Sequence, residues 1–281
     1  MLDADLVVIG AGLSGCSLIA RLRQLQWPGT IAVVEAGRGP GGRTATRRRR
    51  DEPHWRVDHG APGFHLEDPL PESVTSLLDP LCKNGVLRQA KGAVITLGTD
   101  GSVSRSGGPA DREWLEGEPF MASLCEALLA MNDGPLTQHF GRRVRTLQRD
   151  GDHWCVFQES SDWQLRGRRL VLSGSLLAHP RSLAMLDWRQ VPLREAVPAG
   201  QDPELDQALE TLAQSRAEVR WNLMLDLPLN GDQHPRQIWL TPEARAQWRV
   251  ERLVLHPQAN NRTGLVVHGL DSGETITPET Q

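Results

Sequence analysis

Two short apolar runs, residues 6–9 and 30–34, flank a stretch with helical periodicity near the beginning of the chain. Between the runs, Leu13, Cys16, Ile19 and Ala20 recur at the spacing of one helix face, and Trp27-Pro28-Gly29 then interrupts the pattern. Apolar residues at this spacing are typical of an amphipathic helix. We therefore expect a strand, a tight turn, a helix and a second strand.

The patterning of the rest of the chain predicts a mixture of helices and strands. Residues 66–112 combine Pro, Gly and Ser with short apolar runs, which indicates strands and loops. Further helices are expected at 121–129, 181–186 and 205–212, a hairpin at 143–147 and 153–158 around Gly151, and strands at 170–173, 221–227, 237–240 and 265–268. The strand at 170–173 is expected to rejoin the first sheet.

A glycine cluster, Gly10-Ala11-Gly12-Leu13-Ser14-Gly15, lies at the first predicted turn. Gly10 permits the turn, Gly12 lets a pyrophosphate approach the backbone, and Gly15 lets the helix pack on the strand. Glu35 ends the second apolar run, where its carboxylate can accept the ribose hydroxyls of adenosine and disfavours a 2′-phosphate. This pattern predicts a bound dinucleotide and leaves NAD and FAD open.

A second glycine cluster, Gly39-Pro40-Gly41-Gly42-Arg43, follows Glu35 closely. Glycines let backbone approach a ligand, and Arg43 can place a fixed cation beside a pyrophosphate. A chain that only holds adenosine has no evident need for this cluster, so it favours FAD over NAD.

The segment E-A-G-R-G-P-G-G-R-T-A-T, residues 35–46, resembles one found in flavin amine oxidases, phytoene desaturase-like enzymes and renalases. Residues 58–64, D-H-G-A-P-G-F, are similar to the D-x-G-A segment that lies against the flavin in those families. Gly85-Val86-Leu87-Arg88, residues 143–154 and residues 265–268 occur in the same order as in renalase and its bacterial relatives. Within that superfamily the chain therefore looks most like the renalases.

The resemblance implies an α/β fold, with a Rossmann-like FAD-binding domain of the GR2-type flavoproteins and an interleaved α+β substrate domain. The FAD-binding domain is expected at 1–65 and 134–178, and the substrate domain at 66–133 and 179–281. Glycines, the acidic residue and the D-x-G-A segment together make up the expected cofactor-binding residues: Gly10, Ala11, Gly12, Ser14, Gly15, Glu35, Ala36, Gly41, Gly42, Arg43, Gly60, Ala61, Pro62 and Val144.

The activity that the resemblance implies is an FAD-dependent oxidoreductase. A small reduced substrate, NAD(P)H or one of its isomers, would pass hydride to the flavin, and oxygen would accept the electrons. No catalytic residue is assigned. His59 is a candidate for a residue beside the flavin, and the alternative is that it is an ordinary loop histidine. The absence of lysine after Lys91 argues against an ordinary amine oxidase. An amine oxidase or desaturase acting on another donor, and a truncated FAD-binding scaffold protein without catalysis, stay open.

The last residues of the chain lack a pattern that the superfamily normally has. After residues 265–268 we find no strand-G-D-helix unit to close the flavin site, so we expect a shortened chain or a partner chain that completes the site.

Composition excludes several other classes of protein. A net charge of −4 over 281 residues predicts no general affinity for nucleic acid or an anionic membrane. His54, His59 and His65 match no zinc spacing, so no metal is expected. Four cysteines without a C-x-x-C pair indicate reduced, mostly buried thiols, and with no leader pattern the expected location is the cytoplasm.

Overall fold

The computed structural model describes residues 2–67, 69–90, 92–105, 108–131, 133–159 and 162–280. The chain forms two compact units, each built from several segments. Unit 1 contains Met1–Gly42, Leu128–Ala217 and Glu274–Gln281, and unit 2 contains Arg43–Ala127 and Glu218–Gly273. Each unit has its own six-stranded sheet.

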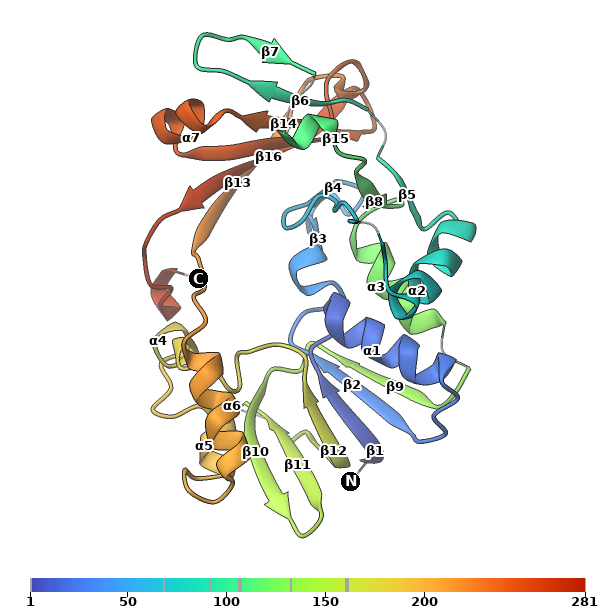
Figure 1. Ribbon diagram of the computed structural model, residues 1–281, viewed down its shortest axis with the longest axis vertical. Coiled ribbons are helices and arrows are strands. Elements are labelled where there is room, and N and C mark those ends of the chain that lie inside the picture. The colour runs from blue at the N-terminus through green and yellow to red at the C-terminus, as the bar shows by residue number, and fades with distance from the viewer. Residues whose placement is uncertain are drawn as a thin grey trace. The chain divides into compact units, whose positions relative to one another are not determined.

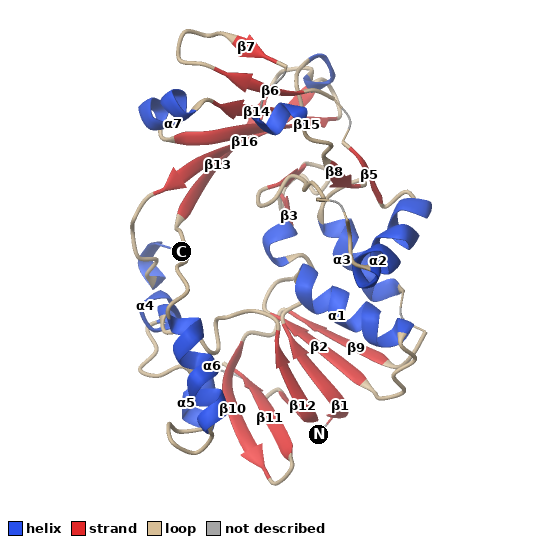
Figure 2. Ribbon diagram, viewed as in Figure 1, coloured by secondary structure: helices blue, strands red, loops and turns tan. Residues whose placement is uncertain are grey.

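The sheet of unit 1 includes both strands that the sequence predicts near the beginning of the chain, and the predicted helix connects them (Figures 1 and 2). In sheet order its strands are β10 (Val144–Asp150), β11 (His153–Gln158), β12 (Gln164–Leu172), β1 (Leu2–Ile9), β2 (Ile31–Glu35) and β9 (Leu136–Phe140). Strands β12, β1, β2 and β9 run parallel, whereas β10, β11 and β12 pair antiparallel. Helix α1 (Leu13–Gln24) connects β1 to β2 and buries Cys16, Ile19 and Ala20. The parallel arrangement brings the carboxyl ends of β1 and β2 to the same edge of the sheet.

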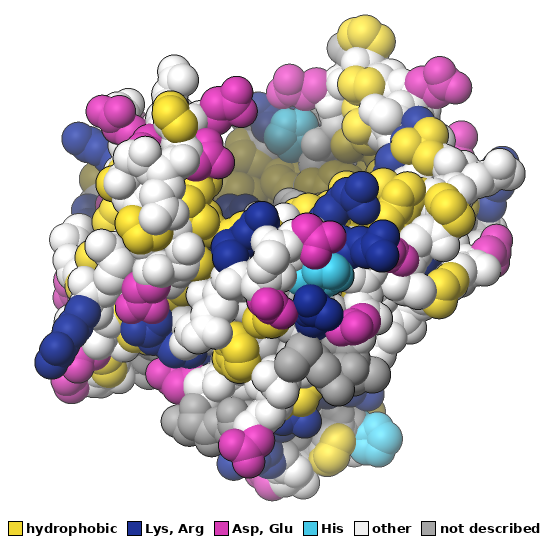
Figure 3. Space-filling view, turned by 90° about the horizontal axis from the view of Figure 1, so that it is seen from below, with side chains coloured by type: hydrophobic (Ala, Val, Ile, Leu, Met, Phe, Trp, Pro, Cys, Tyr) yellow, Lys and Arg dark blue, Asp and Glu magenta, His cyan; other side chains and the backbone are white. Residues whose placement is uncertain are grey.

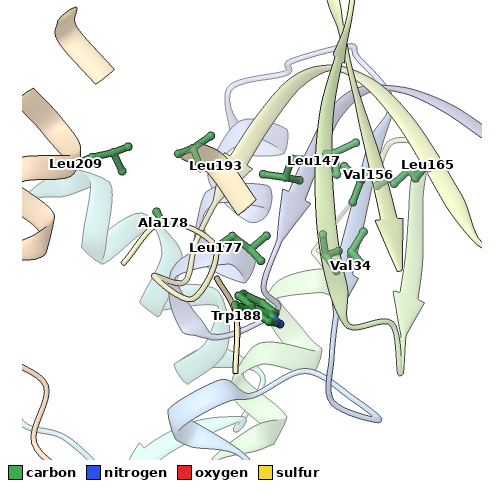
Figure 4. Packing of buried hydrophobic residues seen from close by; sticks show 12 residues of the cluster. Val34, Leu147, Val156, Leu165, Leu177, Ala178, Trp188, Leu193 and Leu209 are labelled. Atoms are coloured by element: carbon green, nitrogen blue, oxygen red, sulfur yellow. The ribbon is translucent and has the colours of Figure 1, made fainter. Parts of the chain in front are cut away.

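The core of unit 1 also includes residues far along the chain (Figure 4). Helices α4 (Arg181–Leu186), α5 (Pro192–Ala196) and α6 (Pro203–Ala213) belong to it. Trp188, Leu193 and Leu209 pack in one buried cluster with Leu147 and Val156 of the sheet. The guanidinium of Arg145 lies 4.7 Å from the centre of the Trp188 ring and forms an ion pair with Glu195 at 2.8 Å. These contacts fix α5 against β10.

The sheet of unit 2 is mostly antiparallel. Its order is β13 (Arg220–Leu227), β16 (Arg262–Asp271), β15 (Val250–Gln258), β14 (Gln237–Leu240), β6 (Val94–Leu97) and β7 (Val103–Ser104), and only β14 and β6 run parallel. A small hairpin of β3 (Thr46–Arg48) and β4 (Arg56–Asp58) packs on this sheet. Trp55 and Val57 lie in one buried cluster with Val254 and Val266. The remaining elements are α2 (Glu72–Lys83), β5 (Leu87–Gln89), β8 (Leu115–Gly117), α3 (Ala122–Ala130) and α7 (Pro242–Trp248).

The structure confirms the βαβ unit, the hairpin of β10 and β11, the helix α3 and the return of β12 to the first sheet.

The expectation of strands and loops alone over 66–112 is wrong, because α2 forms there. Its apolar residues Val74, Leu77, Leu78 and Leu81 have helical spacing, and Leu81 is buried. Pro80 lies inside the helix, and a proline there is typical of a break rather than a helix. The sequence patterns also did not reveal β9, β15, α5 and α7.

The two units follow boundaries that differ from the expected 1–65 with 134–178 and 66–133 with 179–281. Residues 43–65 group with unit 2 because the buried side chains of Trp55 and Val57 pack against β15 and β16. Residues 179–217 group with unit 1 because Leu193 and Leu209 fill its core. Both differences between the observed and the expected boundaries arise from long-range packing, which local sequence patterns do not encode.

The surface and the cysteines fit the composition of the chain. On the face seen in Figure 3, basic and acidic side chains are interspersed. Among the residues described, no helix is both long enough and apolar enough to span a bilayer. None of the four cysteines, all within the described residues, forms a disulfide bond, and three of them, Cys16, Cys125 and Cys155, are buried.

Candidate dinucleotide site and a polar sheet face

The first glycine turn follows β1 in unit 1. Gly10 has a φ of +107°, which side chains rarely allow, and its N–H donates to the carbonyl of Val34 at 2.8 Å. A Cβ at Gly15 would lie 2.2 Å from the Gly10 carbonyl oxygen. The turn and the close contact of α1 with it therefore require glycine at both positions, as the sequence indicates.

The N-terminus of α1 carries no side-chain cap. Gly12 is the N-cap residue, the first turn has no acidic residue, and Ser14 is exposed. The first N–H groups of a helix have no partner within the helix and lie at the positive end of its dipole. This terminus is therefore suited to an anion such as a pyrophosphate.

The second glycine cluster meets the first in unit 1. The N–H of Gly41 donates to the carbonyl of Ala11 at 2.8 Å, and Gly12 and Gly41 form a parallel β-bridge. A Cβ at Gly42, where φ is +54°, would lie 3.1 Å from the Cα of Gly12. Two backbone segments thus lie against each other without side chains between them. We call this glycine pair, Gly12 and Gly42, the cradle. The lack of side chains there permits a ligand to approach the backbone closely.

Glu35 is held by both segments. Its Oε2 accepts the N–H of Ala11 at 2.9 Å, and its Oε1 accepts the N–H of Gly37 at 2.7 Å. The amide of Ala11 is therefore used by Glu35, while Ala36 is exposed. Each carboxylate oxygen retains a further lone pair, so Glu35 can also accept a ribose hydroxyl.

The segment after Gly42 belongs to unit 2 and contacts the D-x-G-A segment there. The N–H of Ala61 donates to the carbonyl of Arg43 at 2.9 Å, and a Cβ at Gly60 would lie 2.0 Å from that same oxygen. The Arg43 side chain is exposed, and Pro62 is buried. Gly60 therefore allows residues 43 and 60–61 to run side by side.

Asp58 is a buried carboxyl group at the end of β4. Its Oδ1 accepts the hydroxyl of Thr46 at 2.6 Å and the N–H of Met121 at 3.2 Å. Burial raises the pKa of Asp58 to about 6, although the two hydrogen bonds act in the opposite direction. This carboxyl group ties the β3–β4 hairpin to the beginning of α3.

His59 follows Asp58 and is half-buried. Its carbonyl accepts the side-chain amide of Asn222 at 2.6 Å, which attaches this loop to β13. The Nδ1 atom has no hydrogen-bond partner. Burial lowers the pKa of His59, and the positive charge of Arg47 acts in the same direction, so the imidazole is neutral at pH 7 and can either donate or accept a hydrogen bond.

Strands β13, β16 and β15 place polar side chains on one face of the sheet of unit 2, on both sides of the apolar residues Val254 and Val266, which Trp55 and Val57 cover. His268 lies directly across from Asn222 on one side and from Arg252 on the other. His256 projects from the same face, because it lies two pairs along from Arg252 on β15. Each of these four side chains has a buried nitrogen or oxygen atom without a hydrogen-bond partner, and His256 has two.

His256 and His268 are both neutral at pH 7. Burial lowers the pKa of His256 to about 3, and the charge of Arg236 acts in the same direction. Burial likewise lowers the pKa of His268 to about 4, with a further contribution from the charge of Arg252. A buried polar atom without a partner costs roughly 1–3 kcal/mol, so this polar sheet face, defined by Asn222, Arg252, His256 and His268, is suited to bind a polar group.

The expected cofactor-binding residues divide between the units. Unit 1 brings together Gly10, Ala11, Gly12, Ser14, Gly15, Glu35, Ala36, Gly41 and Gly42, and unit 2 contains Arg43, Gly60, Ala61 and Pro62. Val144 is in unit 1, where its side chain is buried in the core, so only its backbone is available to a ligand. Among the residues described, no group of three His, Cys, Asp or Glu side chains is placed to hold a metal ion.

The sequence analysis did not single out Asn222, Arg252 and His256 as functional residues. They lie in two strands that are not adjacent, and β15 was not predicted. The apolar run Leu253-Val254-Leu255 and the polar residues at 256 and 258 were the available signal for a strand. Such a pattern is typical of strands in general, so it does not by itself indicate a site.

Comparison with known proteins supports the assignment of the fold. Residues 8–80 match the model of the NAD(P)-binding Rossmann-like domain. Wild-type putrescine oxidase bound to putrescine superposes with a TM-score of 0.57 at 15% identity, over 96% of this chain and 76% of that protein. The CLA-producing fatty acid isomerase from P. acnes gives 0.60 at 12% identity, over 98% and 79%. No curated protein matches the sequence.

These identities are too low to carry an activity across, so the likeness establishes the fold. The glycine turn, the uncapped helix and the acidic end of β2 define unit 1 as a Rossmann-like, dinucleotide-binding unit. The same chain carries a second, mostly antiparallel sheet, and its two units are interleaved along the sequence.

Proposed function

We propose that this protein is an FAD-dependent oxidoreductase that oxidises a small dihydronicotinamide, with oxygen as the electron acceptor. The observation that carries the cofactor is the contact between the two glycine clusters, where Gly41 and Gly42 lie against Ala11 and Gly12 beside the N-terminus of α1. One glycine cluster suffices for an adenine dinucleotide. The second is what favours FAD.

The residues present fit this cofactor. The cradle of Gly12 and Gly42 would be filled by a Cβ at either position, and the free N–H groups of α1 suit a pyrophosphate. Glu35 would hold the ribose of adenosine, and Arg43 would supply a cation to the phosphates. FAD held by these residues would supply a hydride acceptor, and its reoxidation by oxygen, with two electrons and two protons, would yield hydrogen peroxide.

The end of the polar sheet face at Asn222, His268 and Arg252 is the proposed binding surface for the substrate, because the hairpin residue Val57 covers the face near His256. The neutral imidazole of His268 and the Asn222 amide can donate or accept hydrogen bonds, which suits an uncharged carboxamide. Asn222 and His59 are linked by a hydrogen bond, so this face and the D-x-G-A segment are held together within unit 2. The choice of a dihydronicotinamide rests on the resemblance to the renalases and on the lack of lysine after Lys91.

The test is a spectroscopic titration of the purified protein. A yellow protein, or an apoprotein that takes up added FAD, is expected, and NADH, NADPH or one of their isomers should bleach it in the absence of oxygen. Readmitted oxygen should restore the colour and yield hydrogen peroxide. A protein that stays colourless and does not take up FAD contradicts the proposal.

Two other outcomes distinguish the alternatives. Bleaching by a primary amine but by no dihydronicotinamide assigns the protein to the amine oxidases. Stable FAD binding without bleaching by any donor assigns it a role as an FAD-binding scaffold. Arg43→Ala should weaken FAD retention, whereas Arg38→Ala, an exposed arginine of the same loop, serves as the matched control.

A further inference from the structure

Arg252 carries a largely buried positive charge on the polar sheet face of unit 2. Its side chain is 17% exposed, and its Nε atom is buried without a hydrogen-bond partner. Trp239 lies directly opposite on β14, and the guanidinium carbon is over its ring, 4.8 Å from the centre. A guanidinium over a ring interacts through its face, so the N–H groups in its plane remain able to donate to a ligand.

The charge of Arg252 is only partly balanced by the rest of unit 2. Among the residues described, its ion pair is with Glu251, whose Oε2 lies 3.7 Å from Nη1 of Arg252. The same Oε2 atom lies 2.8 Å from Nη1 of Arg220, which also pairs with Glu218. Burial lowers the pKa of Arg252, and the charges of Arg220 and Arg245 act in the same direction, against that of Glu251. Glu251 is therefore shared, and its closer partner is Arg220.

The neighbours of Arg252 across the sheet differ in what they can bind. His268 lies directly opposite on β16, and its Nε2 atom is buried without a partner. As a neutral imidazole it can donate from this atom. Asn222 follows on β13, and its unpartnered atom is Oδ1, which only accepts. Asn222 therefore suits the N–H groups of a carboxamide, whereas Arg252 and His268 together suit a group that accepts hydrogen bonds and carries negative charge.

We infer that Arg252, together with the Nε2 atom of His268, binds an anionic oxygen group of the substrate, a carboxylate or a phosphate. The planar fork of a guanidinium matches two oxygens of either group. This inference rests on the proposed function, because it takes the polar sheet face as the surface that receives the substrate. It adds a determinant of specificity, since Arg252 selects an anionic donor over a neutral donor with the same ring.

The first experiment is a calorimetric titration of the purified protein with benzoate and with phenyl phosphate. Benzyl alcohol is the neutral counterpart. At least one of the two anions should bind, the alcohol should bind much more weakly, and the tighter anion identifies the group. Arg252→Gln should weaken binding of that anion about tenfold or more, because charge-assisted hydrogen bonds are lost. No binding of either anion, or unchanged binding in Arg252→Gln, overturns the inference.

Two further variants make this titration specific. The guanidinium of Arg245 lies 5.7 Å from the centre of the same Trp239 ring, but its Nε–H donates to the carbonyl of Leu240. Arg245→Gln is therefore the matched control, and the anion should still bind. Arg252→Lys keeps the charge and loses the fork, so it should bind the anion more weakly than the unaltered protein. If Arg252→Gln does not fold in a thermal melt, undiminished affinity in Arg252→Lys overturns the inference instead.

The second experiment connects this anion site to the substrate. In the FAD-bound protein, the anion that binds should raise the KM for the dihydronicotinamide and leave kcat unchanged, and Arg252→Gln should abolish this effect. Binding without competition overturns the inference, although bleaching of the flavin would still support the proposed function. A protein that takes up no FAD contradicts the proposed function and the assignment of the anion to its substrate. The calorimetric titration still decides whether Arg252 binds an anion, because it does not depend on the cofactor.

Discussion

The carboxylate of Glu35 accepts a hydrogen bond from the backbone N–H of Ala11 at 2.9 Å, which links the end of β2 to the glycine turn after β1. Its other oxygen accepts the N–H of Gly37. One acidic side chain therefore orders both glycine segments of unit 1. It does so in addition to any role toward a ribose.

Replacing this carboxylate should weaken cofactor binding more than a ribose contact alone would explain. In Glu35→Ala, two backbone N–H groups lose their acceptor, at a cost of roughly 1–3 kcal/mol. We expect FAD retention to fall about tenfold or more, measured from visible absorption after gel filtration. Glu67→Ala, in a surface loop of unit 2, is the control, and equal FAD retention in the two variants would contradict the assigned geometry.

Gly12 and Gly15 should respond differently to the same substitution. Gly12 has a φ of −76°, and a Cβ there would meet the Cα of Gly42 at 3.7 Å and the carbonyl oxygen of Gly41 at 3.9 Å, both ordinary contact distances. We therefore expect Gly12→Ala to fold normally and to bind FAD poorly, because the methyl group occupies the cradle. A thermal melt with and without FAD measures both properties, and normal FAD affinity in this variant would count against the cradle.

At Gly15 an added methyl group meets backbone within the protein. The Cβ would lie 2.2 Å from the Gly10 oxygen, so α1 must move away from the turn. Gly15→Ala should lower the free energy of unfolding by roughly 1–3 kcal/mol, measured by urea denaturation without cofactor. Gly174→Ala, where a Cβ would contact nothing within 4 Å, provides the matched control in the same unit.

The polar sheet face should make the protein sensitive to acid. His256 and His268 have pKa values of about 3 and 4 in the folded chain, below the usual histidine value of 6.5. The unfolded chain therefore binds more protons between pH 6.5 and 4, and stability falls as the pH is lowered through that range. Arg236, Arg252 and His59 act on these histidines in the same direction.

Asp58 opposes this trend over part of the range. Its pKa of about 6 is higher than the usual aspartate value of 3.8, so protonation stabilises the folded chain between pH 6 and 4. Against Asp58, His256 and His268 leave about one net proton, or roughly 1.4 kcal/mol per pH unit. The lowered pKa of His59 acts with the same sign as those of the other two histidines. Urea denaturation at pH 7 and pH 5 measures the slope. His256→Asn should reduce it, whereas the exposed His54→Asn should leave it unchanged.

Local sequence patterns determined the first half of the candidate site. The apolar runs, the spacing of Gly10, Gly12 and Gly15 and the position of Glu35 all lie within one βαβ segment, and the structure confirms that segment. Short-range sterics explain this success, since a turn at a φ of +107° and a 2.2 Å approach of Cβ to backbone admit only glycine.

Tertiary structure alone decided the rest. It placed Trp55 and Val57 against β15 and β16, and so moved residues 43–65 from the expected first domain into unit 2. It also brought Asn222, Arg252, His256 and His268 onto one face beside His59, from strands whose pairing depends on long-range register. Nothing in a local window distinguishes a histidine on a solvated strand face from one buried without a partner, because burial depends on what packs above the strand.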